Sequence, residues 1–357
     1  MILKCYDDLE QYLKKKTLLV CGNSIKYLRI ANFLNDRTNV VRFSDFKPNP
    51  SYESVVNGVN VFRKEKCENI IAIGGGSSID VAKCIKLFSN MSSDINYLQQ
   101  KIVKNDVPLI AVPTTAGSGS EATHFSVIYY NNEKQSISDE SCIPTAVLFD
   151  ATALESLPLN QKKATMMDAL CHAIEAYWSV NATSESMQYS NDAIMLIVNN
   201  YKNYLSGNNA ANGVMLKASN LAGRAINIAK TTAGHAMSYK LTTECNIPHG
   251  QAVALCLNQI WPYMFDYVSN SAPSSAKEHM MIIFSKIAKA MNCNSPQEAI
   301  SKFQLLVKEL ELSAPKVYTA VDYEVLSSSV NTERLKNNPV ALSKAVIKSL
   351  YQKVMEF

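Results

Sequence analysis

The order of apolar and polar positions predicts a sheet of parallel strands in the first part of the chain. Short apolar runs are separated by segments with helical spacing. Continuous apolar runs are typical of strands that helices cover on both faces. Strands are predicted at Thr17–Cys21, Val40–Phe43, Asn69–Ile73, Pro108–Val112 and Ala146–Phe149, and helices at Ile25–Leu34, after the cap residue Ser51, and at Val81–Phe88. The alternation indicates an α/β domain with a mostly parallel sheet.

The pattern changes after Asp150. From Asn160 to the C-terminus nearly every segment has helical spacing, interrupted by glycines and prolines. The chain is therefore predicted to fold as a nucleotide-binding-type α/β domain at 1–157 and an all-helical domain at 158–357. The cleft between two such domains is the default place for a ligand.

Composition narrows the class of protein. The chain has 357 residues, of which 47% are hydrophobic, and 35 basic and 31 acidic side chains give a formal net charge of +4. This near-neutral balance lacks the excess of basic residues that is typical of nucleic-acid-binding proteins. No apolar run is long enough to span a bilayer, and the start does not have the pattern of a signal peptide. Nine scattered cysteines without a Cys-x-x-Cys pair are typical of reduced thiols, so we expect a cytoplasmic protein. From the charge balance and the apolar runs, we expect neither nucleic acid nor a membrane as a partner.

Two loops that follow predicted strands have the composition of phosphate sites. In the first, Gly74–Gly76 and Ser77 precede a helix, so backbone amides at its N-terminus could approach a diphosphate. The alternative is a tight turn in which Ser77 and Asp80 form a capping box, and the G-x-G-x-x-G fingerprint is absent. The second loop, Pro113–Thr123, is small and rich in hydroxyls, which suits phosphate or ribose.

Three of the five histidines lie in apolar contexts, two of them next to a glycine, and together they indicate a metal site. Asp168 and His172 are four residues apart, which places both side chains on one face of a helix. His235 and His249 follow in Gly234–Met237 and Pro248–Gly250. Taken singly, each histidine is better explained as a core or capping residue, whereas together they favour a metal. One carboxylate and three imidazoles suit Fe(II), Mn(II), Co(II) or Zn(II) better than Ca(II) or Mg(II).

Taken in order, these motifs resemble the iron-containing (group III) alcohol dehydrogenases over almost the whole chain. The matching segments are Gly74–Lys83, Pro113–Ser118, Asp168–Glu175, His235 and Pro248–Gly250. The resemblance implies a Rossmann-like N-terminal domain and a helical C-terminal domain, the dehydroquinate synthase-like fold. It also implies a metal between the domains, NAD(H) or NADP(H), and the interconversion of aldehydes and alcohols.

The resemblance assigns roles residue by residue. It implies that Asp168, His172, His235 and His249 bind Fe(II), or Zn(II) or another divalent metal in its place. It further implies that the coenzyme is bound by two loops and one lysine: Gly75, Gly76, Ser77, Thr114, Thr115, Ser118 and Lys134.

Two positions depart from the family pattern. Members usually carry a second histidine four residues after the third ligand, as part of a proton relay, and here that position is Tyr239. A tyrosine hydroxyl could still donate a proton, but its ordinary pKa near 10 makes it a different relay from an imidazolium. The residue that is often an aspartate in NAD-using members is Gly22, which leaves room for a 2′-phosphate and favours NADP(H) without excluding NAD(H).

The stretch Ala222–Lys240 resembles the phosphonoacetaldehyde reductase subgroup. Arg224, Lys230 and Lys240 surround the third metal histidine in the sequence, where many members have an uncharged run. A cation near the metal would suit an anionic substrate, so Arg224 and Lys230 are candidate substrate-binding residues. The alternative is that these side chains face solvent or pair with nearby acids.

The predicted function is an iron- and NAD(P)H-dependent oxidoreductase that interconverts an aldehyde and a primary alcohol, with phosphonoacetaldehyde as the candidate substrate. A general butanol- or propanediol-type dehydrogenase is the nearest alternative. A non-redox metal enzyme of the dehydroquinate synthase type and a non-catalytic nucleotide or metal sensor are the others. We expect a homodimer, across which a short N-terminal strand could pair.

Overall fold

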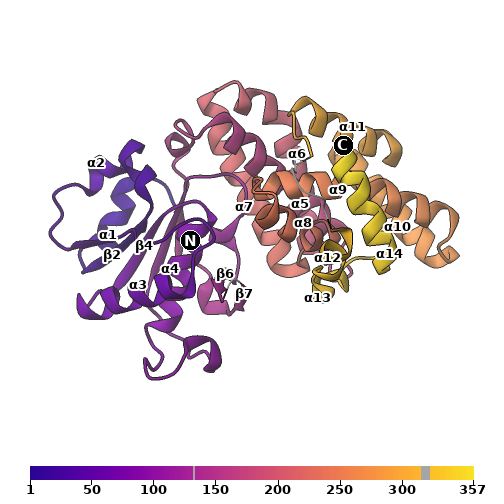
Figure 1. The fold of residues 1–357 in the computed structure, drawn as a ribbon. Coiled ribbons are helices and arrows are strands. Elements are labelled where there is room, and N and C mark those ends of the chain that lie inside the picture. Colours follow the sequence, from indigo (N-terminus) through magenta and orange to yellow (C-terminus); the bar gives the residue numbers. More distant parts are fainter. Residues whose placement is uncertain (132, 315–321) are drawn as a thin grey trace. The chain divides into compact units, whose positions relative to one another are not determined.

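The chain folds into two compact units of different class (Figure 1). The computed structural model describes residues 1–131, 133–314 and 322–357. The first unit comprises residues 1–157 together with 207–220, and the second comprises 158–206 and 221–357. A parallel sheet with helices makes up the first unit and helices make up the second, in agreement with the predicted fold class.

Six parallel strands form the sheet of the first unit, in the order β1-β8-β5-β4-β2-β3. The strands are β1 (Ile2–Leu3), β2 (Thr17–Cys21), β3 (Val40–Phe43), β4 (Asn69–Gly74), β5 (Leu109–Pro113) and β8 (Ala146–Leu148). Their helices are α1 (Glu10–Leu13), α2 (Ile30–Leu34), α3 (Tyr52–Lys64) and α4 (Gly76–Phe88). Because all six strands run the same way, the loops after β4 and β5 lie at one edge of the sheet.

Alternate residues of each central strand enter two different cores. Ile70 and Ala72 of β4 pack with side chains of α3 and α4, while Ile71 and Ile73 pack on the opposite face with those of α1 and α2. This division explains the continuous apolar runs of the sequence, since helices bury both faces of the sheet.

The predicted strands are confirmed to within a residue or two, but three local features differ from the predictions. The predicted helix at 25–34 is interrupted by Leu28, which is extended, because the buried side chains of Ile25, Leu28 and Ile30 do not lie on one helical face. An antiparallel hairpin, β6 (Phe125–Tyr130) and β7 (Glu133–Ser138), was not anticipated. The capping box of Ser77 and Asp80 is absent: Gly75 caps α4, and Asp80 accepts hydrogen bonds from Ser120 and Val127.

The N-terminal strand β1 pairs with β8 of its own chain. Leu3 is buried by this pairing, and β1 forms one edge of the sheet among the described residues. The pairing of this strand across a homodimer stays a prediction.

The second unit is made of helices, several of which pack directly against the first of them. They are α5 (Leu159–Trp178), α6 (Ser184–Leu205), α8 (Ala233–Glu244), α9 (His249–Asn270), α10 (Ser274–Ala290), α11 (Pro296–Glu309), α12 (Tyr323–Ser328), α13 (Thr332–Leu335) and α14 (Lys344–Glu356). Helix α7 (Asn209–Ala229) contributes its first half to the first unit and its second half to this one. The ring of Trp178 meets those of Trp261 and Phe284 edge to face, which fixes α5 against α9 and α10.

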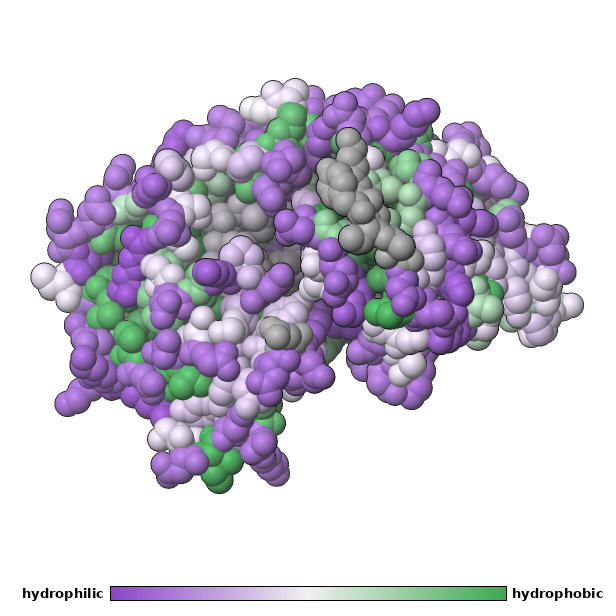
Figure 2. Space-filling model, in the orientation of Figure 1, coloured by the Kyte–Doolittle hydropathy of each residue, from purple (hydrophilic) through white to green (hydrophobic). Residues whose placement is uncertain are grey.

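Hydrophilic side chains cover most of the helical unit on the face that Figure 2 shows. Within the described part of the chain, no helix combines the length and the apolar composition that crossing a bilayer requires. Most apolar residues of these helices are instead buried in the core.

Candidate metal centre

Helix α5 carries three ionisable side chains in its most buried turns. Asp168, His172 and Glu175 recur at helical spacing, and their stripe faces His235 of α8 and His249 of α9. All three are buried among apolar neighbours. Burying a carboxylate or an imidazole costs free energy unless it gains a charged or hydrogen-bonding partner, so this stripe requires partners from other elements.

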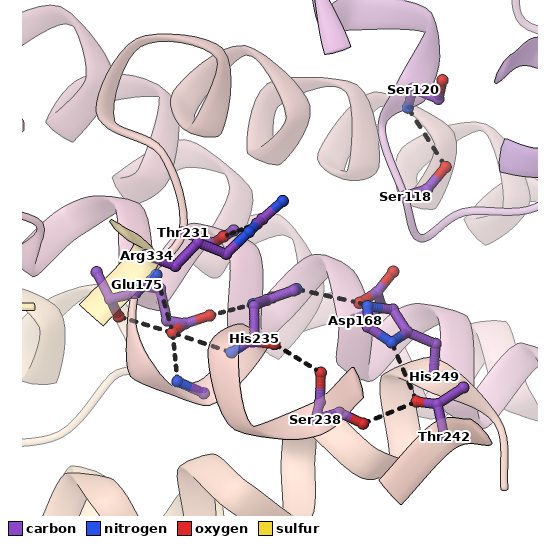
Figure 3. A network of polar contacts seen from close by, with 12 residues as sticks. Ser118, Ser120, Asp168, Glu175, Thr231, His235, Ser238, Thr242, His249 and Arg334 are labelled. Atoms are coloured by element: carbon purple, nitrogen blue, oxygen red, sulfur yellow. Dashed lines mark hydrogen bonds and ion pairs between the residues drawn. The ribbon is translucent and has the colours of Figure 1, made fainter. Parts of the chain in front are cut away.

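The partners come from the N-terminal turns of α8 and α9 (Figure 3). His235 Nε2 lies 3.5 Å from Asp168 Oδ1, and His249 Nε2 lies 4.0 Å from the same oxygen. One ligand atom from each of the three residues lies within 4.8 Å of the other two. Two ligands of one divalent ion, each bound at about 2.1 Å, are separated by roughly 3 to 4 Å, so this spacing fits a shared metal ion.

The hydrogen-bonding state of these atoms supports the same interpretation. Asp168 Oδ1 and His235 Nε2 are buried, and neither has a hydrogen-bond partner among the described residues. An unsatisfied acceptor and an unsatisfied ring nitrogen aimed at one point are costly in an apolar surrounding. A metal ion coordinated by both atoms would remove that cost.

His172, the fourth predicted ligand, lies beside this group. Its ring stacks on that of His235 with a centroid separation of 4.2 Å and an interplanar angle of 16°. The structure thus gathers all four predicted residues, with Asp168, His235 and His249 as the tight cluster.

The imidazoles determine the charge of the carboxylate. Burial alone would raise the pKa of Asp168, but His172, His235 and His249 around it lower that pKa below its usual range. Burial likewise opposes ionisation of Glu175, and the neighbouring His235 nevertheless keeps its pKa below the ordinary value. Both carboxylates are therefore anionic and available to a cation or its ligands.

Glu175 holds the start of α8 and orients His235. Its carboxylate accepts hydrogen bonds from the backbone nitrogens of Thr232 and Gly234, at 3.2 and 2.8 Å, and from the Thr232 hydroxyl at 2.7 Å. It also contacts His235 Nδ1, which directs Nε2 of the same ring toward Asp168. Gly234 allows this approach, because a Cβ there would lie 3.1 Å from Glu175 Oε1.

Gly250 brings α9 into direct contact with α5. A Cβ at this position would lie 1.9 Å from the carbonyl oxygen of Ala164 and 2.9 Å from Asp168 Cβ. Only glycine permits this separation, and it places the preceding residue, His249, beside Asp168. His249 Nδ1 also lies 3.3 Å from the hydroxyl of Thr242, which helps to fix the ring.

In the first unit, the two predicted coenzyme loops are fitted to each other. A Cβ on Gly75 would lie 3.2 Å from the Thr115 hydroxyl, and one on Gly76 would lie 2.9 Å from that of Ser118. The Thr114 amide donates to Gly74 O at 3.0 Å. Gly75 caps α4, so Gly76 and Ser77 begin the helix and their amides point out of its N-terminus, the arrangement that binds phosphate. Lys134 lies on β7.

Comparison with known proteins decides the family. The family model for iron-containing alcohol dehydrogenase matches residues 2–151, and that for the C-terminal region of the Fe-containing alcohol dehydrogenase family matches residues 162–355. The chain belongs to the iron-containing alcohol dehydrogenase family. Members use iron and NAD(P), which agrees with the donor set on α5, α8 and α9 and with the loop at the start of α4.

The similarity to individual relatives spans different shares of this chain and of the relatives' own lengths. Alcohol dehydrogenase 4 of Schizosaccharomyces pombe is 30% identical over 96% of the chain and 82% of its own length. Aldehyde-alcohol dehydrogenase 2 of Entamoeba histolytica is 30% identical over 79% of the chain, but the match spans only 35% of that longer protein. A sulfoacetaldehyde reductase from Bifidobacterium kashiwanohense, solved with NAD+, shares the fold with a TM-score of 0.87 over 99% of this chain and 96% of that one, at 24% identity.

The remaining predicted site residues do not all lie near the histidines. The Tyr239 ring is parallel to that of His249, with a centroid separation of 5.8 Å and an interplanar angle of 6°. Arg224 is exposed and lies over the ring of Tyr189 on α6, so the structure does not bring it to the histidines. Lys230 is exposed between α7 and α8 in a left-handed conformation, and Lys240 pairs with Glu244.

The sequence by itself assigned no role to two residues at this centre. Glu175 belongs to the same helical stripe as Asp168, so the spacing identified its face but not its contact with α8. Arg334 on α13 lies over the ring of Tyr239, and no motif marks it, because it is far from the histidines in sequence.

Proposed function

We propose that the protein is an iron- and NAD(P)H-dependent dehydrogenase that interconverts an aldehyde and a primary alcohol. The observation that carries the proposal is the cluster of Asp168, His235 and His249, whose ligand atoms lie within 4.8 Å of one another. Two of these atoms, Asp168 Oδ1 and His235 Nε2, are buried without hydrogen-bond partners in the described chain. The glycine loop at the start of α4 supports a dinucleotide coenzyme.

In this proposal Asp168, His235 and His249 hold Fe(II), with His172 as the fourth ligand. When bound, the ion supplies Lewis-acid polarisation of a carbonyl oxygen. Glu175 keeps the His235 ring in the tautomer that directs Nε2 toward Asp168. The coenzyme diphosphate is bound by the amides of Gly75, Gly76 and Ser77, with Thr114, Thr115, Ser118 and Lys134 as further coenzyme contacts.

Tyr239 is the proposed proton relay of the reduction. Its ring lies parallel to that of His249, which places a hydroxyl-bearing side chain next to a proposed metal ligand. A tyrosine hydroxyl, or an ordered water that it holds, can supply the proton that the alcohol product gains on its oxygen.

A net hydride transfer separates this function from its rivals. A non-redox enzyme of the dehydroquinate synthase type would turn over without net change of its coenzyme, and a sensor would not turn over at all. The test is the fall of NADPH absorbance with Fe(II)-loaded protein and a set of aldehydes that includes phosphonoacetaldehyde, propanal and butanal. Consumption of NADPH that depends on both iron and aldehyde is expected; a loaded protein that consumes none with any aldehyde would overturn the proposal.

The coenzyme preference is proposed to be NADP(H). A Cβ on Gly22 would meet no atom within 4 Å, so the space after β2 is open. The guanidinium of Arg42, at the end of β3, donates to Gly22 O at 3.3 Å and to the Ser44 hydroxyl at 2.8 Å. Arg42 also lines a pocket of about 650 Å³ together with Lys26 and Asp36. An exposed guanidinium beside open space is suited to a 2′-phosphate.

We expect Arg42→Ala to raise the KM for NADPH by roughly ten- to a hundredfold, because charge-assisted hydrogen bonds to the 2′-phosphate would be lost. The KM for NADH should change little. Steady-state kinetics with both coenzymes and one aldehyde measure this. The matched control is Arg29→Ala, an exposed arginine that pairs with Glu155 in the same unit. An equal rise for NADH and NADPH would remove Arg42 from coenzyme selection.

A further inference from the structure

Arg334 is a cation beside the proposed metal centre. Its guanidinium lies 5.2 Å from the centroid of the Tyr239 ring, and that ring is parallel to His249. Its Nη1 donates to the hydroxyl of Thr231 at 2.6 Å, just before the helix that carries His235 (Figure 3). Arg334 therefore contacts the segment that carries His235 directly, and the Tyr239 ring connects it to His249.

In the described part of the chain, the charge of Arg334 is not matched by a carboxylate. Neighbouring charges on the same surface form ion pairs, such as Glu333 with Lys336 at 2.6 Å and Glu324 with Lys348 at 2.7 Å. Among the described residues, no acidic oxygen lies within ion-pair distance of Arg334, although the side chain is half-buried. A guanidinium has five N–H donors, and Thr231 occupies one of them. The others remain suited to an anion, which would also offset the cost of withdrawing the charge from water.

The segment that carries Arg334 is held in place. The backbone nitrogen of Arg334 donates to the side chain of Asn331, which caps α13. Asn337, at the other end of α13, donates to Thr231 O at 3.0 Å, and its own carbonyl accepts from Val180 N at 3.0 Å. A guanidinium positioned in this way loses little further freedom when it binds a ligand.

We infer that Arg334 binds the anionic group of the substrate and makes the enzyme selective for short aldehydes that carry an oxyanion. The inference rests on the proposed function, which places the carbonyl at Asp168, His235 and His249. From His249 to the guanidinium there are only two ring contacts, through Tyr239. A chain of roughly two to four carbon atoms is enough to bring a phosphonate, sulfonate or carboxylate within reach of it. Arg224, in contrast, is engaged by Tyr189.

The test compares Arg334→Ala and Arg334→Lys with the wild-type, Fe(II)-loaded enzyme. For phosphonoacetaldehyde, kcat/KM of Arg334→Ala should fall roughly ten- to a hundredfold, mainly through KM, because a charged hydrogen bond is lost. Propanal should be reduced at nearly the wild-type rate. Arg334→Lys retains the charge without the planar fork and should lie between the two. Lys336→Ala, an exposed cation two residues further along the chain, is the matched control.

Sulfoacetaldehyde and succinic semialdehyde are further substrates to be compared with propanal in the same experiment. The aldehyde whose advantage over propanal falls most in Arg334→Ala identifies the oxyanion that the site prefers. A loss of equal size for propanal and for every anionic aldehyde would overturn the inference and leave the dehydrogenase function intact.

A binding measurement separates this inference from the proposed function. Ethylphosphonate has no carbonyl group and cannot be reduced. Its binding by calorimetry should weaken by the same factor in Arg334→Ala and be unchanged in Lys336→Ala. Wild-type binding that Arg334→Ala lacks would support the anion site even if no aldehyde is reduced. Equal binding by all variants would overturn the anion site, whatever the activity.

Discussion

Asp168→Ala is expected to lose bound iron and NADPH-dependent aldehyde reduction together. Asp168 provides the carboxylate of the cluster, and its Oδ1 faces both His235 Nε2 and His249 Nε2. Removing it leaves imidazoles without the anion that offsets the charge of a divalent ion. Lewis-acid polarisation contributes several kcal/mol to such a reaction, so kcat/KM should fall by at least roughly a thousandfold.

The measurement pairs iron content by mass spectrometry with the rate of NADPH oxidation. Asp168→Asn is the second variant, because it keeps the size of the side chain and therefore separates loss of charge from loss of packing. Asp266→Ala, on the exposed side of α9, is the control and should retain both iron and activity. A fully active, iron-free Asp168→Ala would refute the metal mechanism.

Gly250→Ala is expected to destabilise the second unit and to weaken iron binding. The new Cβ would lie 1.9 Å from Ala164 O, a backbone atom that cannot yield without moving α5 or α9. Overpacking of this kind costs about 1–3 kcal/mol, and moving the start of α9 displaces His249 from Asp168. Urea unfolding of the iron-free protein measures the stability, and iron titration measures the affinity.

The matched control is Gly213→Ala on α7. A Cβ there would make only an ordinary contact, 3.8 Å from Ala151 Cβ. Alanine also has the higher helix propensity, so Gly213→Ala should be neutral or stabilising by up to about 1 kcal/mol. If Gly250→Ala behaves like this control and binds iron normally, the close approach of α9 to α5 does not position His249.

The hairpin of β6 and β7 lacks the hydrophobic pattern that predicted the parallel strands. Apolar runs identified the parallel strands, because helices bury both of their faces. The hairpin strands are largely half-buried and polar, so they lack that signal. The helix predicted at 25–34 failed for a related reason, since three apolar side chains reached one core without lying on one helical face.

By itself, the sequence determined the class of the fold, and it predicted the two phosphate-type loops and the residue types of the proposed metal cluster. Those features depend on local periodicity and on motifs whose spacing lies within one helix or one loop, such as Asp168 and His172. The close packing of α9 on α5, the hold of Glu175 on α8 and the position of Arg334 beside Tyr239 were decided only by the tertiary structure. Each of these is a contact between segments that are distant in the chain. Such contacts depend on how the helices pack, and no local pattern in a single sequence records that packing.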